Sequence, residues 1–154
     1  AFTASVCNLR PESRGHVRLR DAHPASAPLI DPNYLSAPGD RAFFVRALPK
    51  LRAVLSTQPI AAMIASEFQP GSSVSTPEDV LAFVRSKAAT ISHPCGSCRM
   101  GDDDDAVVDP ALRVREVEGL RIADASVFPR ITSGNINATC LMIGEKAADL
   151  IQQA

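Results

Sequence analysis

The sequence predicts an α+β fold, because strand-like and helix-like patterns occupy separate stretches of the chain. Alternating residues at 15–21 and short apolar runs at 106–114 and 119–129 are typical of strands. The stretches 40–55 and 76–90, and a run from residue 137 to the end, carry apolar residues at helical spacing. With 154 residues, 45% of them hydrophobic, the chain is long enough to bury a core without metal or disulfides.

The strand signals come first along the chain. Residues 2–6, "FTASV", alternate as a strand does, and the chain enters this pattern at once. In "GHVRLRD", Val17 and Leu19 share one face and arginines occupy the other, which predicts a half-buried strand. The following stretch 22–35 contains three prolines, so we interpret it as an ordered loop.

The first helix is expected to begin at Asp40, a good N-cap residue. Four apolar residues then follow at spacings of four, three and four, on one helical face: Phe44, Leu48, Leu51 and Leu55. Pro49 lies inside this pattern and should kink or break the helix.

The second helix has a clearer start. Thr76 suits the N-cap, Pro77 the first helical position, and Glu78 and Asp79 the first turn. This helix should end near Thr90 and deliver the chain to His93.

The final helix is expected to be capped by Asn137. Its first two turns are apolar nearly all round, a pattern typical of a buried helix.

Charge and composition exclude several classes of protein. A formal net charge of -1 argues against a nucleic-acid binder that relies on bulk charge. No apolar stretch approaches the roughly 20 residues that span a bilayer, and the first residues do not resemble a secretory signal. Four unevenly placed cysteines do not indicate a secreted disulfide framework. We expect a cytoplasmic protein, with peripheral association with a membrane left open.

The segment "HPCGSCRMG", residues 93–101, contains several side chains that can bind a metal ion or take part in catalysis. His93, Cys95 and Cys98 are metal ligands by type, but a structural zinc site needs four, and the second pair is missing. The C-x-x-C spacing also fits a thiol redox site, although the strand-to-helix context of such sites is absent. The four aspartates after it do not have calcium-loop spacing and suggest a solvated loop.

The start of the final helix changes the interpretation of the histidine. "ITSGNINATCLMIGE" places two asparagines and a glycine at the entry of this helix, where free backbone amides favour negative charge. A histidine and an amide side chain that face such a helix start would combine a base with hydrogen-bond donors that stabilise an anion. His16 and His23 are not paired with a comparable motif, and we expect them to be surface or loop residues.

Together, "HPCGSCRMG", "VVDPALRV", "GLRIADASVFPR" and "GNINATCLMIGEKAADLI" resemble the C-terminal region of glucose-methanol-choline (GMC) flavoprotein oxidoreductases. "SRGHVRLR" and "PLIDPNYL" resemble the start of that region, so the resemblance covers nearly the whole chain. Within the family, the sequence is most similar to choline dehydrogenases and other bacterial alcohol dehydrogenases.

The resemblance implies a fold and a division of the chain. Residues 1–119 would belong to the substrate-binding domain, an antiparallel sheet flanked by helices. Residues 120–154 would form a strand–helix segment that returns to the FAD-binding domain.

The resemblance also implies oxidation of a small alcohol by transfer of hydride to N5 of FAD. His93 falls on the position of the family's active-site histidine, which takes the hydroxyl proton or holds the alkoxide. Imidazole suits this role because it exchanges a proton near neutral pH. Asn135 falls on the partner position and would hydrogen-bond the substrate oxygen. Ser97 stands where threonine is more usual in the family.

Five further positions match cofactor-binding segments of the family. Asp124 and Ala125 match the segment that contacts the chain linking flavin to nucleotide. Asn137, Ala138 and Thr139 match the segment whose backbone amides meet the flavin edge where negative charge develops. Cys95 and Cys98 would shape the loop that presents the histidine, and we expect both to be buried, reduced and unligated. No metal site is expected.

The family's G-x-G-x-x-G unit, which holds the ADP part of FAD, is not found in this sequence. We therefore expect an incomplete and inactive chain, a fragment or a split or processed subunit. Its expected partners are a small alcohol substrate and the N-terminal FAD-binding region, in cis or on another chain. Two alternatives stay open: a thiol-disulfide or metal-binding module that uses Cys95 and Cys98, and a catalytically silent interaction domain of GMC origin.

Overall fold

The computed structural model describes residues 1–153, and the chain divides into two compact units. The first unit comprises Ala1–His16 and Ile30–Ala89. The second comprises Val17–Leu29 and the chain from Thr90 onward. Both segments in which site residues are predicted, the His93 loop and the start of the last helix, therefore belong to the second unit.

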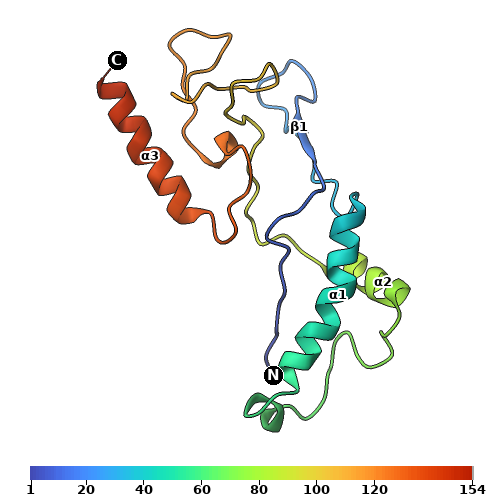
Figure 1. Ribbon diagram of the computed structural model, residues 1–154. Helices are drawn as coiled ribbons and strands as arrows, with labels where there is room; N and C mark the ends of the chain where they lie inside the picture. Colours follow the sequence, from blue (N-terminus) through green and yellow to red (C-terminus); the bar gives the residue numbers. More distant parts are fainter. Residues whose placement is uncertain (154) are drawn as a thin grey trace. The chain divides into compact units, whose positions relative to one another are not determined.

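The first unit is built on two helices that pack against each other, α1 (Pro38–Leu55) and α2 (Pro77–Lys87) (Figure 1). The short 3-10 helix η1 (Ile60–Met63) follows α1. The predicted start of α1 was wrong, because the helix begins at Pro38, with Ala37 as its N-cap. The fixed φ and missing N–H of proline suit a first turn. Pro49 does not end the helix, which continues to Leu55.

Asp40 is buried in the first turn of α1 and binds the N-terminal segment instead of capping the helix. Its Oδ1 accepts hydrogen bonds from Asn8 Nδ2 at 3.0 Å and Glu12 N at 2.8 Å, and its Oδ2 accepts one from Ser13 N at 2.8 Å. Burial raises the pKa of Asp40, but hydrogen bonds from Ser13 and Glu12 outweigh burial and lower it overall.

The start of α2 confirms the sequence prediction. Thr76 is the N-cap, and Pro77 occupies the first helical position. The side chains of Thr76 and Asp79 form a reciprocal capping box, with both hydrogen bonds at 3.2 Å. The helix ends at Lys87, a little earlier than predicted.

A small antiparallel sheet of two strands, β1 (His16–Arg18) and β2 (Leu29–Asp31), is formed in the described part of the chain. All six residues are exposed, so β1 is confirmed as a strand but is not half-buried. β2 lies within the stretch interpreted as a loop. Residues 2–6, which alternate in sequence, are not assigned to a strand.

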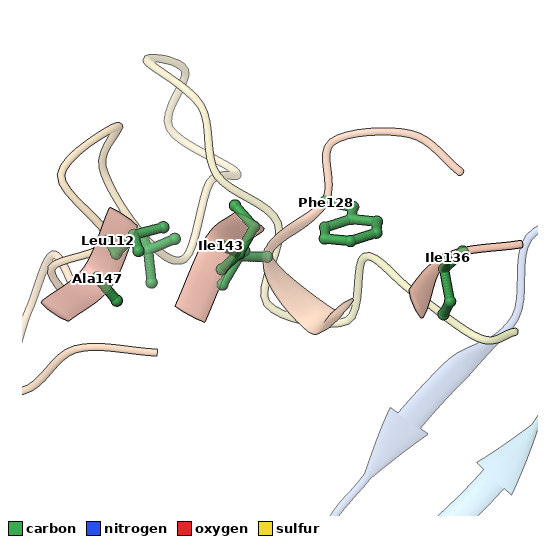
Figure 2. Packing of buried hydrophobic residues seen from close by; sticks show 7 residues of the cluster. Leu112, Phe128, Ile136, Ile143 and Ala147 are labelled. Atoms are coloured by element: carbon green, nitrogen blue, oxygen red, sulfur yellow. The ribbon is translucent and has the colours of Figure 1, made fainter. Parts of the chain in front are cut away.

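The second unit has a hydrophobic core formed between α3 (Asn137–Gln152) and the preceding loops (Figure 2). Its fully or nearly fully buried members are Val108, Leu112, Val127, Phe128, Ile136, Ile143 and Ala147. Figure 2 shows that Ile143 and Ala147 come from α3, whereas Leu112 and Phe128 come from the loops.

The predicted strands at 106–114 and 119–129 were wrong. Isolated bridges join Val108 to Val114 and Arg113 to Arg121, and Ala125–Val127 form the 3-10 helix η2. Local bonds replace a strand ladder, since Asp109 Oδ1 accepts hydrogen bonds from two nearby backbone amides. Leu112 has a φ of 64°, which interrupts an extended backbone.

The prediction that Asn137 caps α3 was also wrong. Asn137 is the first residue of the helix, Ile136 is the N-cap, and no side chain forms a cap hydrogen bond. The helix is not buried on all sides. Ile143 and Ala147 are buried, whereas Leu141 is 65% exposed and Met142 is 53% exposed. Within residues 1–153, the structure thus has three α-helices and a small sheet, in agreement with the α+β prediction at this coarse level.

Candidate active site

The loop that carries His93 is shaped by two residues in the left-handed region. Ser92, directly before the histidine, has a φ of 61°, and Gly96 has a φ of 84°. The Ser92 amide donates to Thr90 Oγ1 at 2.9 Å, which stabilises the first turn. A non-glycine residue with positive φ is uncommon and costs free energy. His93 itself is half-buried between these two turns.

Three backbone hydrogen bonds, here called the loop–turn bonds, attach this loop to η2. Gly96 N donates to Ala125 O at 3.2 Å, Cys98 N to Ser126 O at 2.9 Å, and Met100 N to Val127 O at 2.8 Å. The side chains of Cys95 and Met100 also pack against the hydrophobic core of this unit. The structure therefore brings together two segments that were predicted separately, the His93 loop and Asp124–Ala125.

A Cβ would make close contacts at two glycines of this loop. A Cβ at Gly96 would lie 3.2 Å from Phe128 O. A Cβ at Gly101 would lie 3.0 Å from both Arg99 Nη1 and Asp103 Oδ2. The loop thus passes close to the backbone after η2 and beneath an ion pair.

That ion pair gives one aspartate of the acid run a definite role. Arg99 Nη1 donates to Asp103 Oδ2 at 2.8 Å, and Arg99 Nη2 donates to Asp103 Oδ1. The hydrogen bonds from Arg99 lower the pKa of Asp103 to about 2. The other three aspartates, at 102, 104 and 105, are exposed, as expected for a solvated loop.

Asp124 lies at the start of η2. Its Oδ1 accepts a hydrogen bond from Ser126 N at 2.7 Å, so the carboxylate caps the turn. Asp124 is exposed and Ala125 is half-buried. The Ala125 carbonyl accepts two hydrogen bonds, from Gly96 N and from Phe128 N, both at 3.2 Å.

The start of α3 presents unused hydrogen-bond donors. The first intrahelical acceptor, Ile136 O, binds Cys140 N at 2.9 Å, so the amides of Asn137, Ala138 and Thr139 precede the helical hydrogen-bond pattern. No residue in the described part of the chain accepts from these three amides. Asn137 and Ala138 are exposed. A set of N–H donors at the positive end of a helix is suited to stabilising a negative charge.

Asn135 is exposed two residues before α3. Within residues 1–153, no hydrogen bond joins Asn135 to His93, although both belong to the second unit. The catalytic roles of these two side chains, and the cofactor contacts of the five other predicted positions, stay predictions.

The two cysteines of the loop were expected to be buried, and this was wrong. Cys95 and Cys98 are both only partly buried, because this loop runs along the surface of the core and not through it. Over residues 1–153, no three His, Cys, Asp or Glu side chains gather into a group that could hold a metal ion.

A family model described as GMC oxidoreductase matches residues 11–144. The chain belongs to the GMC oxidoreductase family. This confirms the resemblance inferred from the motifs.

Curated relatives of this GMC chain are enzymes several times its length. It is 43% identical over 150 residues to an alcohol dehydrogenase [acceptor] of Pseudomonas putida, covering 97% of this chain and 27% of the relative. It is 45% identical over 152 residues to an oxygen-dependent choline dehydrogenase of Brucella ovis, covering 97% of this chain and 28% of the relative. The chain thus spans little more than a quarter of these proteins.

Two solved structures share the fold of this GMC chain. A pyridoxine 4-oxidase from Mesorbium loti matches with a TM-score of 0.89 and 36% identity, covering 95% of this chain and 28% of that one. A fungal aryl-alcohol oxidase matches with a TM-score of 0.85 and 38% identity, covering 94% of this chain and 24% of that one.

The sequence interpretation missed three features of this candidate site. The i,i+4 spacing of Arg99 and Asp103 gives no signal for their ion pair, because that rule applies to helices and these residues are not helical. The sequence Asp-Ala-Ser at 124–126 is compatible with a side-chain-capped turn. The loop–turn bonds have no local sequence signal, because they join backbone groups of distant segments.

None of the helices in residues 1–153 combines the length and the apolar character needed to cross a membrane.

Proposed function

We propose that this chain is the C-terminal part of a flavoprotein that oxidises an alcohol by hydride transfer to FAD. The supporting observation is that the loop–turn bonds hold the His93 loop against Asp124–Ala125, in the same unit as the free amides of α3. Several relatives are named for alcohol oxidation, among them an alcohol dehydrogenase and an aryl-alcohol oxidase.

In this proposal, His93 is the base and alkoxide partner. Its imidazole takes the proton of the substrate hydroxyl or holds the resulting oxygen anion, and general-base catalysis of this kind is worth about 10²- to 10⁴-fold in rate. The two turns at Ser92 and Gly96 hold the backbone on either side of the imidazole, so less freedom is lost on reaching the reactive geometry.

Asn135 supplies a hydrogen bond to the substrate oxygen. A neutral amide does so without titrating, so its contribution does not depend on pH. When bound, FAD accepts the hydride. The amides of Asn137, Ala138 and Thr139 would hold the flavin edge, and Asp124 and Ala125 would hold the chain that links flavin to nucleotide.

The remainder of the FAD site is proposed to come from an N-terminal region, in cis or on another chain. We propose further that residues 1–119 belong to the substrate-binding domain, whose antiparallel sheet is completed by that region. Residues 120–154 would return to the FAD-binding domain. The exposed Leu141 and Met142 on α3 support this, because adjacent apolar side chains at a surface can form part of a contact patch.

The test is His93→Ala in the complete, FAD-loaded enzyme. We expect the rate of flavin reduction by the alcohol to fall at least about 100-fold, with FAD content unchanged. His16→Ala is the matched control, because His16 lies in the exposed strand β1. A His93→Ala enzyme that reduces its flavin within a few-fold of the normal rate would refute the base assignment.

The incompleteness of the chain has its own test. The isolated 154-residue chain should purify without stoichiometric FAD and should not oxidise alcohols. A yellow preparation whose flavin is reduced by an alcohol would contradict this part of the proposal.

A further inference from the structure

The carboxylate of Asp124 holds the turn against which the His93 loop is bound. Asp124 Oδ1 accepts from Ser126 N at 2.7 Å, an interaction that closes the turn at the start of η2. The carbonyls of the three residues of η2 accept the loop–turn bonds. One carboxylate oxygen therefore orients the acceptors that fix the loop.

We propose that Asp124 is a positioning residue for His93, acting through η2 and the loop–turn bonds. This inference rests on the proposed function, and it adds a role for Asp124 that differs from contact with the cofactor. The chain of contacts runs from the Asp124 carboxylate to Ser126 N, from Ser126 O to Cys98 N, and along the loop to His93.

The two roles make different demands on the side chain. A turn of this kind needs an acceptor oxygen two residues before the amide, and asparagine supplies it as well as aspartate does. A role that depends on charge needs the carboxylate itself. The Asp124→Asn and Asp124→Ala variants therefore separate the roles, because Asn keeps the acceptor without the charge and Ala loses both.

The experiment measures amide hydrogen exchange of the peptide covering residues 95–101 in the complete, FAD-loaded enzyme. We expect exchange at Cys98 and Met100 to become about 5- to 10-fold faster in Asp124→Ala, the usual size of a lost cap. Exchange in Asp124→Asn should stay within about twofold of wild type. Asp21→Ala is the control, because Asp21 Oδ1 closes a similar exposed turn by accepting from His23 N at 2.8 Å.

Enzyme kinetics provide the second readout. In Asp124→Ala we expect kcat to fall about tenfold with a much smaller change in KM, because a misplaced base affects the chemical step. Asp124→Asn should recover most of that loss, and Asp21→Ala should show none.

Unchanged exchange in Asp124→Ala, or exchange in Asp124→Asn as fast as in Asp124→Ala, would overturn the inference. If Asp124→Ala does not assemble, the exchange measurement is made on Asp124→Asn and Asp124→Ser instead. Both keep an acceptor and should retain slow exchange, and fast exchange in both would overturn the inference. Exchange does not depend on whether His93 is the base, so His93→Ala tests the proposed function separately.

Discussion

Replacing Gly96 by alanine tests how closely the His93 loop must be held against the turn at η2. Gly96 has a φ of 84°, and an alanine there would adopt a left-handed conformation at a cost of about 1–2 kcal/mol. Its Cβ would also lie 3.2 Å from Phe128 O. That carbonyl belongs to the segment that follows η2, so relieving the contact would shift the loop against the turn that holds it.

Gly71 provides a closely matched control. It has a φ of 85°, and a Cβ at this position would meet nothing within 4 Å. Gly71→Ala should therefore lower the free energy of unfolding only by the cost of the backbone conformation. That cost is about 1 kcal/mol once the reduced entropy of the unfolded chain is included. Gly96→Ala should cost about 1 kcal/mol more, because of the close contact.

The assay compares urea unfolding and kcat/KM for alcohol oxidation in the two holoenzyme variants. Gly71→Ala should leave kcat/KM unchanged, whereas Gly96→Ala should lower it about tenfold, since small displacements of a catalytic group are costly. Equal loss of stability in both variants, together with normal kcat/KM in Gly96→Ala, would refute the reasoning that Gly96 aims His93.

Three further predictions concern stability. Thr76→Ala removes the cap of α2 and should lower the free energy of unfolding by about 1 kcal/mol in urea titrations. Asp40→Asn turns an amide N–H towards the Ser13 amide that now donates to Oδ2, and we expect a loss of about 2 kcal/mol by the same measurement; a neutral effect would contradict the buried network. Hydrogen bonding to Arg99 lowers the pKa of Asp103 from 3.8 to about 2, so its stabilising contribution is fully present above pH 3.8 and is lost as the pH falls through about 2. In Arg99→Gln, NMR titration of the Asp103 carboxyl should show the pKa returning towards 3.8, and a value that stays near 2 would identify another cause.

The structure departs from the sequence prediction mainly where hydrogen bonds, both long-range and local, override the local propensity. Asp40 has the right side chain for a cap, but the N-terminal segment supplies three donors and the carboxylate binds them instead. The stretches 106–114 and 119–129 have strand-like composition. In 106–114 the extended conformation is interrupted by the turn at Asp109 and by the left-handed Leu112. In 119–129 it is interrupted by η2, which Asp124 caps.

The sequence alone was sufficient to predict the family and the α2 helix. Several motifs in a fixed order are specific to the family, and the capping signals at Thr76–Asp79 are local and chemically unambiguous. His93 and Asp124 were also named as candidates from the sequence, because they match motifs of the family, and their roles stay predictions.

The tertiary structure alone decided how those candidates are held. The loop–turn bonds join backbone amides at 96, 98 and 100 to carbonyls at 125, 126 and 127. Every residue except proline offers the same amide and carbonyl, so no sequence pattern specifies which of them will pair. That choice depends on how the core around Val127 and Phe128 packs, and it fixes where the His93 loop lies.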